Sequence, residues 1–498
     1  MMSRQSASVT CRIADLLGSL GQVSGGNPEI AGLTMDSRAV RPGYLFLACK
    51  GAASHGLEFA AEAIERGAAA IAWEPAGFDV ARLSVPMARV EYLAARAGEI
   101  AARFYGFPAE QLRVIGVTGT NGKTSIVHYI AQCLDRAGST VGLIGTLGVG
   151  LYGKAAASTH TTPDAVRNQQ LLAEFLQNGA GSAVMEVSSH ALDQGRVNAI
   201  RYATAVFTNL THDHLDYHGD MATYAAAKRK LFATPGLEAA VINADDVVGS
   251  ALLSELPRGV RRVAYSLRGP VPGVMSVWAD RLASHPEGMA FELHTPWGDA
   301  SLQSRLLADF NVANLLAAAS VLLLASIPFD EVVSLLQQVT SVVGRMETLG
   351  GGEQPLVVVD YAHTPDALAQ SLMALRAHTQ GKLICVFGCG GDRDADKRPE
   401  MGRIVEQKAD VGIITNDNPR FEAPESIVQD IQRGLRHVDV MPVVLDRRDA
   451  IEAALRLAAP GDAVLIAGKG HEEYQIIGRQ RFPFSDRLVV TEFLEGEA

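Results

Sequence analysis

Short apolar runs that predict strands alternate with longer stretches of helical periodicity. This pattern changes near residues 90 and 343. Residues 1–90 combine short strands and turns with one helix–strand unit, which predicts a small α/β domain. Residues 91–343 begin with a helical stretch and continue as strand–helix–strand units, which predicts a central parallel sheet buried on both faces. Residues 344–498 repeat this pattern, so we expect a third, Rossmann-like α/β domain. A length of 498 residues also favours about three domains.

Two segments depart from the alternation. Residues 255–305, with Pro257, Pro270 and Pro272 among their prolines, predict an antiparallel or loop-rich insertion. The apolar run from Leu315 to Phe329 contains two serines and is closed by a proline. It is shorter than the roughly 20 residues that a membrane-spanning helix needs, so we predict a buried helix.

Composition narrows the class of protein. The net charge of -11 argues against a general nucleic-acid binder, which is usually basic. The cysteines are odd in number and scattered, which predicts reduced, mostly buried thiols rather than a disulfide framework. They are Cys11, Cys49, Cys133, Cys385 and Cys389. The first ten residues, MMSRQSASVT, lack the apolar core of a signal peptide. We therefore expect a cytoplasmic protein without a membrane span.

The stretch VIGVTGTNGKTS, Val114 to Ser125, is similar to a phosphate-binding loop. The usual pattern G-x-x-x-x-G-K-[ST] places its first glycine where this chain has Val117. An apolar strand before the loop and a helical pattern after it put Gly122, Lys123 and Thr124 at a helix N-terminus, which favours an anion. Lys123 adds a positive charge, and the Thr124 hydroxyl suits Mg²⁺. The alternative is a glycine-rich turn with a solvated lysine.

Carboxylates and histidines follow the next predicted strands. Glu186 ends an apolar strand, where it is either a Mg²⁺ ligand or a capping or salt-bridged side chain. Further on, His212, His214 and Asp216 fit the H-x-H-x-D pattern of zinc hydrolases. The next position is Tyr217 rather than histidine, and no later cluster supplies further ligands, so zinc hydrolysis is a remote alternative.

Four predicted strands of the last domain end in glycine or polar clusters. They read PLVVVDYAH, KLICVFGCGGDRD, ADVGIITNDNPR and DAVLIAGKGHE. Ligands of open parallel sheets bind at the carboxyl ends of the strands. A binding site is therefore expected at this edge of the third domain.

Several of these motifs together resemble the Mur ligases and their folylpolyglutamate synthetase relatives. The spelling G-x-x-G-T-N-G-K-T resembles the family's loop, and NLTHDHLDYHG is followed by Y-x-x-A-K-x-x-L-F. FNVAN, GRME and DYAHTPDAL then occur in the family's order, so the resemblance extends over nearly the whole chain. The resemblance implies that the loop binds ATP through Gly119, Thr120, Asn121, Gly122, Lys123, Thr124 and Ser125, with Asn311, Arg345 and His363 as further contacts.

The resemblance also assigns a metal site and a modified lysine. It implies that His214 binds a metal and that Lys228 is carbamylated to N6-carboxylysine. By pattern alone Lys228 is a solvated helix lysine. Carbamylation turns its cation into a carboxylate-like group, which could hold a second Mg²⁺. The implied catalytic residues are Lys123, Glu186, His214 and Lys228, and the implied Mg²⁺ ligands are Thr124, Glu186, His214 and carbamylated Lys228.

The Mur ligases act one after another on UDP-N-acetylmuramic acid. The segments of this chain are most similar to the third of these ligases, which extends UDP-N-acetylmuramoyl-L-alanyl-D-glutamate. MDSRAVRPGYLFLACKG resembles its UDP-binding domain, with Ser37 near the uridine diphosphate. HTTPD and SSHALDQGR resemble the segments that hold the sugar-peptide. Their candidate contacts are Thr161, Thr162, Ser188, Gln194 and Arg196. After Gly51 the residues AASHG replace more polar residues of some relatives, which leaves the uridine contacts there open.

The motif DNPR indicates the amino acid that is added. In the family it accompanies meso-diaminopimelate, whereas lysine-adding members usually lack its arginine. Diaminopimelate has one carboxylate more than lysine, and Arg420 offers that group two parallel donors, worth roughly 1.5–3 kcal/mol. Standing alone, DNPR would be a plain turn with a solvated arginine. The implied contacts are Arg393, Asp417, Asn418, Pro419, Arg420, Gly468 and Glu472.

The resemblance thus implies an ATP-dependent amide ligase of peptidoglycan precursor synthesis. It would join meso-diaminopimelate to UDP-N-acetylmuramoyl-L-alanyl-D-glutamate through an acyl phosphate, with Mg²⁺. The alternatives are the same reaction with L-lysine and a folylpolyglutamate synthetase-like ligase. The expected partners are these small molecules and ATP, with no nucleic acid, and the expected state is a monomer.

Overall fold

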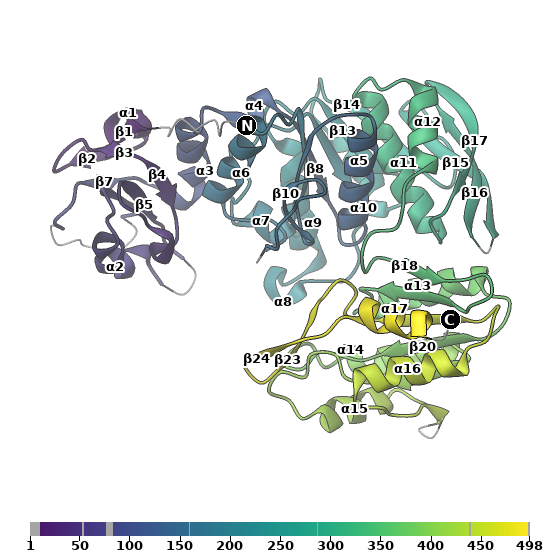
Figure 1. Ribbon diagram of the computed structural model, residues 1–498. Helices are drawn as coiled ribbons and strands as arrows, with labels where there is room; N and C mark the ends of the chain where they lie inside the picture. Colours follow the sequence, from purple (N-terminus) through teal and green to yellow (C-terminus); the bar gives the residue numbers. More distant parts are fainter. Residues whose placement is uncertain are drawn as a thin grey trace. The chain divides into compact units, whose positions relative to one another are not determined.

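The computed structural model describes residues 10–51, 54–75, 83–158, 160–285, 287–437 and 440–496. They form two compact units. The first unit runs to Ser266 and includes Pro270–Val277 and Ala317–Ile327, and the second contains the other described residues. Figure 1 shows the elements of both units.

The first unit begins with a five-stranded sheet of order β2-β7-β6-β5-β4, whose strands are parallel except β2. Along β5, Leu45 and Leu47 belong to one buried cluster and Phe46 to another, so both faces of the sheet are covered. The elements are β1 (Cys11–Arg12), α1 (Ile13–Leu17), η1 (Gly18–Leu20), β2 (Gln22–Ser24), β3 (Glu29–Ile30), β4 (Gly32–Thr34), η2 (Ser37–Ala39), β5 (Tyr44–Ala48), η3 (Gly56–Phe59), α2 (Ala60–Glu65), β6 (Ala70–Trp73), β7 (Met87–Arg89) and α3 (Leu93–Phe104).

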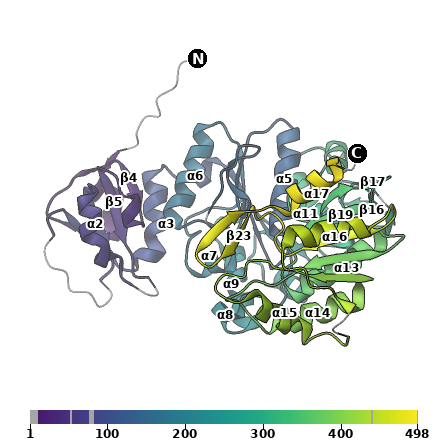
Figure 2. The same cartoon turned by 60° about the horizontal axis from the view of Figure 1, so that its bottom comes forward.

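A larger sheet follows in the same unit, with the order β10-β9-β11-β8-β12-β13-β14. All neighbouring pairs from β9 to β14 are parallel, and β10 is antiparallel to β9. Helix α5 packs on β8, β9 and β11, and α3 lies beside α6 in Figure 2. The elements are α4 (Pro108–Gln111), β8 (Arg113–Thr118), α5 (Lys123–Arg136), β9 (Val141–Gly145), β10 (Gly148–Leu151), α6 (Ala165–Gln177), β11 (Ser182–Glu186), α7 (Ser189–Asp193), β12 (Thr204–Phe207), α8 (Leu215–His218), α9 (Met221–Arg229), η4 (Lys230–Ala233), β13 (Ala239–Asn243), α10 (Val247–Glu255) and β14 (Arg261–Ser266).

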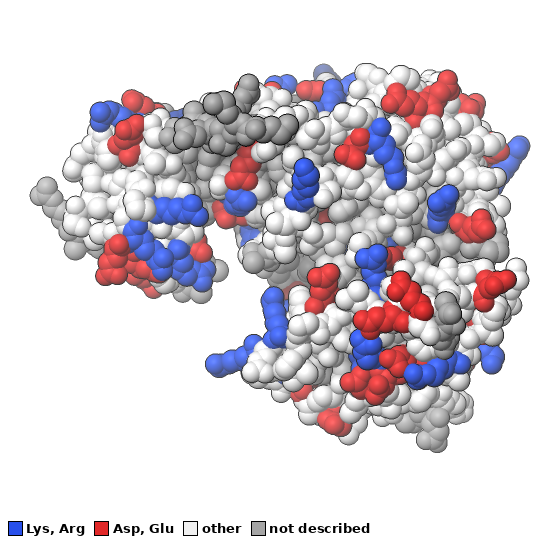
Figure 3. All heavy atoms as spheres, in the orientation of Figure 1, with Lys and Arg blue, Asp and Glu red and all other residues white. Residues whose placement is uncertain are grey.

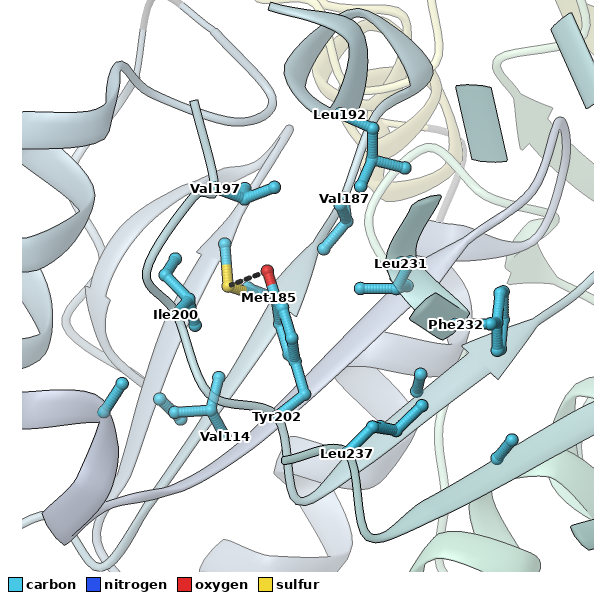
Figure 4. Close-up of a cluster of buried hydrophobic side chains, with 14 of the residues drawn as sticks. Val114, Met185, Val187, Leu192, Val197, Ile200, Tyr202, Leu231, Phe232 and Leu237 are labelled. Atoms are coloured by element: carbon cyan, nitrogen blue, oxygen red, sulfur yellow. Dashed lines mark hydrogen bonds between the residues drawn. The ribbon is translucent and has the colours of Figure 1, made fainter. Parts of the chain in front are cut away.

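One face of this larger sheet carries a buried apolar cluster around Tyr202 (Figure 4). The ring of Tyr202 is fully buried, and its hydroxyl points to the sulfur of Met185 at 3.7 Å. A Cβ on Gly116 would lie 2.7 Å from this ring, so glycine is needed there for packing. The cluster fixes β8 and β11, the two strands whose carboxyl ends lead into the glycine loop and to Glu186.

The second unit contains an antiparallel set, β15, β16 and β17, and a five-stranded sheet of order β18-β19-β22-β20-β21. In the latter sheet only β18 is antiparallel. The elements are β15 (Met275–His285), β16 (Gly288–Thr295), β17 (Gly298–Ser304), α11 (Asp309–Leu324), α12 (Phe329–Gln337), β18 (Glu347–Gly350), β19 (Leu356–Asp360), α13 (Pro365–His378), β20 (Leu383–Phe387), α14 (Lys397–Lys408), β21 (Val411–Ile414), α15 (Pro424–Gln432), α16 (Arg447–Leu457), β22 (Ala463–Ala467), β23 (Tyr474–Ile477), β24 (Gln480–Pro483) and α17 (Asp486–Gly496). Of these, the start of β15 and the part of α11 from Ala317 onward belong to the first unit.

The three-part α/β organisation predicted from the sequence is confirmed, while the boundaries at 90 and 343 stay a prediction. The apolar run that begins at Leu315 lies in α11 and is buried up to Leu324, as predicted. The predicted antiparallel insertion is found from β15 onward, but its first part was assigned wrongly. Arg261–Ser266 forms β14, which pairs in parallel with β13 because its apolar residues continue that sheet.

Further sequence predictions have mixed outcomes. All five cysteines are free, and three of them are buried. No helix among the described residues is long and apolar enough to cross a membrane. On the face shown in Figure 3, acidic and basic side chains are intermixed over both units. The first nine residues, and Ala52 and Ala53 of the segment after Gly51, lie outside the described residues.

Candidate active site

The glycine loop connects β8 to α5, and its geometry explains the unusual position of its first glycine. Val117 is a buried residue of β8, so the position where the usual pattern has glycine still belongs to the strand. The chain turns at Gly119 (φ 150°), where a Cβ would lie 1.8 Å from the Thr208 hydroxyl oxygen. Gly122 (φ 83°) then precedes the first residue of α5 in a left-handed conformation. Both glycines are required by the backbone.

Two lysine side chains converge on this loop. The Lys123 ammonium donates to the carbonyl oxygens of Gly119 at 2.9 Å and Thr120 at 2.8 Å. The Lys228 ammonium, from α9, donates to the same Gly119 oxygen at 2.8 Å. The seven residues predicted to bind phosphate, from Gly119 to Ser125, therefore surround a place with two positive charges at a helix N-terminus. Such an arrangement favours an anion.

Lys228 is buried, so the prediction of a solvated lysine from pattern alone is wrong. Its side chain is 1% exposed, and the ammonium lies 4.4 Å from the centre of the Tyr224 ring. Burial, and then the charge of Lys123, lower the pKa of Lys228 well below its usual value, while Asp213 opposes this shift. The neutral amine is therefore much more accessible than in a surface lysine.

Glu186 lies next to the loop at the carboxyl end of β11. It is 1% exposed, and one of its oxygens accepts hydrogen bonds from the hydroxyls of Thr124 at 3.0 Å and Thr146 at 3.2 Å. The other oxygen accepts from the backbone N–H of Thr146 at 2.8 Å. Among the described residues Glu186 forms no ion pair, so the salt-bridged alternative is not supported. A buried carboxylate beside a hydroxyl at a helix N-terminus fits a hard cation such as Mg²⁺.

The residues predicted to bind the sugar-peptide are connected to Glu186 by hydrogen bonds. The Thr161 hydroxyl lies 3.0 Å from that of Thr146, and the Thr162 hydroxyl donates to the backbone oxygen of Glu186 at 2.8 Å. Ser188 donates its backbone N–H to the Thr162 hydroxyl at 3.2 Å. The chain therefore places these three residues beside the buried carboxylate.

Arg196 and Gln194 extend this network toward a pocket of about 920 Å³. Arg196 donates to the Thr162 carbonyl at 3.2 Å and to the Gln194 side-chain oxygen at 2.6 and 2.9 Å. Ser37, Gln194 and Arg196 all line the pocket. Tyr217, which was not among the predicted contacts, also lines it and receives a hydrogen bond from Gln194 at 3.1 Å. This contact joins Tyr217 of α8 to Gln194 at the end of α7, two segments whose contact leaves no signal in the sequence.

The histidines do not form a zinc cluster. His212 is exposed, and His218 is bonded to the Ser189 hydroxyl at 3.0 Å. His214 instead packs edge-on against His190, with ring centres 4.9 Å apart. Among the described residues, no three His, Cys, Asp or Glu side chains are arranged to hold a metal. A magnesium site needs fewer protein ligands, because Mg²⁺ keeps several waters and binds phosphate oxygens.

The charges of both lysines act on His214. The His214 side chain is 47% exposed, and partial desolvation with the charges of Lys123 and Lys228 lowers its pKa, while Asp213 and Asp216 oppose the shift. The imidazole is therefore favoured in its neutral form, which is the form that binds metals. The His214 ring lies 6.2 Å from the Tyr224 ring, over which the Lys228 ammonium lies at 4.4 Å, so His214 and Lys228 flank the same tyrosine.

In the second unit, the carboxyl ends of the parallel strands bring the predicted diaminopimelate residues together. The Arg420 guanidinium donates to the Gly391 carbonyl at 2.7 Å, and the Gly391 N–H donates to the Asn418 carbonyl at 2.9 Å. A Cβ on Gly468 would lie 2.7 Å from a carboxylate oxygen of Asp417, which explains glycine at that position. These contacts therefore bring together the loops that follow β20, β21 and β22.

The remaining predicted contacts of this site differ in their exposure. Asp417, Asn418 and Pro419 are buried, Arg420 is half-buried and Arg393 is exposed. The Asn418 amide donates to a Glu472 carboxylate oxygen at 2.8 Å. Lys469, which was also not among the predicted contacts, is fully buried beside both. A lysine between glycines gives no periodicity from which its burial could be predicted.

The predicted nucleotide contacts of the second unit lie partly around Tyr361. The Arg345 guanidinium lies over the Tyr361 ring at 4.6 Å, and the His363 ring centre is also 4.6 Å from it. His471 joins this group, and burial, followed by the Arg345 charge, lowers its pKa to about 4. Asn311 is buried in α11, where its amide donates to the Leu307 carbonyl.

Comparison with known proteins finds relatives that match nearly the whole chain. Models of the Mur ligase family match residues 29–105 (Mur ligase family, catalytic domain), 117–322 (Mur ligase middle domain) and 344–470 (Mur ligase, glutamate ligase domain). A protein of Coxiella burnetii named UDP-N-acetylmuramoyl-L-alanyl-D-glutamate–2,6-diaminopimelate ligase is 48% identical over 459 residues, which are 92% of this chain and 94% of the relative.

Solved structures show the same architecture. One, titled as a UDP-N-acetylmuramoyl-L-alanyl-D-glutamate–2,6-diaminopimelate ligase, is 34% identical, has a TM-score of 0.71 and covers 98% of this chain and 99% of its own. A MurF ligase of Thermotoga maritima in complex with ADP is 18% identical, has a TM-score of 0.65 and covers 94% of this chain and 98% of its own. The latter likeness concerns the fold.

Three α/β parts, a glycine loop beside a buried carboxylate and the matches to ligases place the chain in the class of ATP-dependent ligases. Within that class, the matches of sequence and structure identify the family. The chain belongs to the Mur ligase family.

The loop geometry predicts the effect of Gly119→Ala. Its Cβ would collide with the Thr208 hydroxyl and displace the carbonyl oxygen that both lysines share. Because displacements of about 1 Å can cost about 100-fold in rate, we expect kcat/KM for ATP to fall at least that far. Steady-state kinetics with a thermal-unfolding control measures this.

Gly138→Ala is the matched control, because Gly138 also has positive φ (82°) but has no atom within 4 Å of an added Cβ. It should lower stability slightly and leave kcat/KM for ATP unchanged. Equal losses of activity in both variants would contradict the role assigned to the loop geometry.

Proposed function

We propose that the protein is an ATP-dependent amide ligase that adds meso-2,6-diaminopimelate to the D-glutamyl residue of UDP-N-acetylmuramoyl-L-alanyl-D-glutamate, a step of peptidoglycan precursor synthesis. The observation that carries the proposal is the pair of lysines on the Gly119 oxygen beside the buried Glu186 carboxylate. The 48% identical relative with this name supports the choice of substrates.

In the first step, an oxygen of the glutamyl γ-carboxylate attacks the γ-phosphorus of ATP, and ADP leaves. The product is an acyl phosphate. Two anions must approach each other, so the main obstacle is electrostatic. Lys123 would offset this repulsion from the start of α5, where the positive end of the helix dipole adds to its charge.

In the second step, the neutral amine of diaminopimelate attacks the acyl carbon. A tetrahedral intermediate forms and collapses to the amide as phosphate leaves and takes up the proton that the nitrogen loses. The C–O bond of the acyl phosphate breaks, so one carboxylate oxygen departs with the phosphate. One ATP becomes ADP and phosphate for each amide bond formed.

The residues beside the loop fit Mg²⁺. The Thr124 hydroxyl and the Glu186 carboxylate are hard oxygen donors, and the carboxylate has no cationic partner among the described residues. When bound, Mg²⁺ would neutralise phosphate charge during transfer. We propose that these two residues hold it.

The Lys228 side chain can bind a metal cation only after modification, because its ammonium would repel the positive ion. Its neutral amine can add CO₂ to give a carbamate and release a proton, and its lowered pKa favours that form. The carbamate supplies oxygen ligands where the bare lysine supplies a positive charge. We propose that N6-carboxylysine 228 and His214 hold a second Mg²⁺.

The two substrates are assigned to the two described networks. The pocket of about 920 Å³ that Ser37, Gln194 and Arg196 line suits the UDP-sugar, with Thr161, Thr162 and Ser188 toward the peptide. In the second unit, Arg420 would face the extra carboxylate of diaminopimelate. Lysine would leave that guanidinium with backbone oxygens as its partners among the described residues, which disfavours L-lysine as the amino acid that is added.

The N-terminal part of the chain and its cysteines bear on the class of ligase and on where it acts. A match to the family's N-terminal part at residues 29–105 disfavours a folylpolyglutamate synthetase-like ligase.

Five free cysteines are compatible with a reducing compartment, so we propose action in the cytoplasm. We also propose that the enzyme works as a monomer on small-molecule substrates.

Phosphate release with the UDP-muramoyl dipeptide tests the amino-acid assignment. With ATP and Mg²⁺, meso-diaminopimelate should support turnover and L-lysine should be at least about 10-fold poorer in kcat/KM, as a lost charged hydrogen bond implies. Arg420→Ala should raise KM for diaminopimelate at least about 10-fold with little change in KM for ATP.

Arg433→Ala is the matched control, because that arginine of the same unit is 72% exposed at its side chain. It should leave both Michaelis constants unchanged. Equal turnover with L-lysine, or equal effects of Arg420→Ala on both constants, would contradict the assignment. Phosphate release without any amino acid would contradict the ligase itself.

Lys228→Ala tests the carbamate. Loss of the modified side chain should lower kcat at least about 100-fold, and millimolar acetate or propionate should restore part of the activity by supplying a carboxylate. Lys154→Ala, which changes an exposed lysine of the same unit, should have no effect. Full activity of Lys228→Ala without any added acid would show that the carbamate is not required.

A further inference from the structure

Lys469 is the most deeply buried lysine near the predicted diaminopimelate site. It follows β22 closely, its side chain is 0% exposed, and it lies in the second unit together with all of its partners. Burying an ammonium costs free energy unless hydrogen bonds and an opposite charge compensate. Its partners therefore indicate what the lysine holds in place.

Those partners are two of the predicted contacts to the amino acid. The Lys469 ammonium donates to the Asn418 side-chain oxygen at 3.1 Å and to Oε2 of Glu472 at 3.0 Å. Asn418 also donates its own amide Nδ2 to Oε2 of Glu472 at 2.8 Å. The three side chains form a closed triangle of hydrogen bonds.

The triangle fixes the orientation of the Asn418 amide. Its oxygen accepts from Lys469 and also from the backbone N–H of Ile476 at 2.9 Å. Its nitrogen must then face Glu472, since reversing the amide would turn Nδ2 toward two donors. Lys469 thus fixes the Asn418 amide with its oxygen toward the ammonium and its nitrogen toward Glu472.

The triangle also distinguishes the two oxygens of Glu472. Oε2 receives both donors, whereas Oε1 has no hydrogen-bond partner among the described residues. Glu472 is mostly buried, with a side chain that is 17% exposed. A carboxylate held by one oxygen presents the other in a fixed direction, and its natural complement is an ammonium group.

We propose that Lys469 is a positioning residue for amino-acid recognition. It holds Oε2 of Glu472 and the Asn418 amide so that Oε1 of Glu472 receives the distal ammonium of diaminopimelate, the amine that does not form the amide bond. This proposal rests on the proposed function, because it needs diaminopimelate as the substrate. Arg420 would recognise the carboxylate of the same end.

Lys469→Met, which keeps the length and removes the charge, tests the proposal. KM for diaminopimelate should rise at least about 10-fold, with little change in KM for ATP and the UDP-muramoyl dipeptide. Preference for diaminopimelate over 2-aminopimelate, which lacks the distal amine, should fall at least about 10-fold in kcat/KM. A lysine that only stabilised the fold would not change that preference.

A double-mutant cycle with Glu472→Gln locates the effect. If Lys469 acts through Glu472, adding Lys469→Met to Glu472→Gln should change the substrate preference less than about 3-fold, since coupled residues are not additive. Independent, additive effects would overturn the proposal. So would an equal rise of KM for ATP in Lys469→Met.

Two controls separate the possible failures. Lys382→Met changes an exposed lysine of the same unit and should leave all constants unchanged. If Lys469→Met does not yield folded protein by thermal unfolding, Glu472→Asp shortens the same contact and should lower the preference over 2-aminopimelate; an unchanged preference overturns the proposal. If the wild type does not turn over diaminopimelate, the proposed function itself fails.

Discussion

The structure of the first unit depends on one carbonyl oxygen that accepts hydrogen bonds from two lysines. Gly119 can offer this oxygen to Lys123 and Lys228 only because the loop turns with positive φ against Thr208, where a side chain would not fit. Two like charges at one oxygen repel each other, and burial adds to the cost for Lys228. An anion or a carbamate relieves this repulsion. The same constraint would therefore favour both the phosphate binding and the lysine modification that we propose.

The second unit uses compensated buried charges to hold its strand ends. Arg447 and Asp486 are fully buried and bonded at 2.7 and 2.8 Å, and the guanidinium also donates to the carbonyls of Ala467 and Asn416. These carbonyls lie at the end of β22 and just after β21. A buried pair adds little net stability, but removing one partner is costly. The pair thus anchors the loops that carry Asn418 and Lys469.

Local sequence was sufficient for some of these features and insufficient for others. The parallel strands, the loop at the start of α5 and the helix after Leu315 follow from periodicity and glycines, which act over a few residues. The burial of Lys228 does not, because lysine is rarely buried and its acceptor is distant in the chain. Lys469 was missed because it stands between glycines, where no periodicity marks a buried residue, and Tyr217 because its contact with Gln194 joins separate segments of the chain. The family resemblance pointed to Lys228, while only the folded chain gives its contacts.

Transfer of oxygen from the substrate to phosphate tests the central claim most directly. The γ-carboxylate of the UDP-muramoyl dipeptide is labelled with ¹⁸O, and phosphate released during turnover with diaminopimelate is analysed by mass spectrometry. If the carboxylate is phosphorylated before the amine attacks, each phosphate carries one labelled oxygen and the amide keeps the other. Unlabelled phosphate would show that water, rather than the carboxylate, attacks ATP. That result would contradict the assignment of this loop to acyl-phosphate formation.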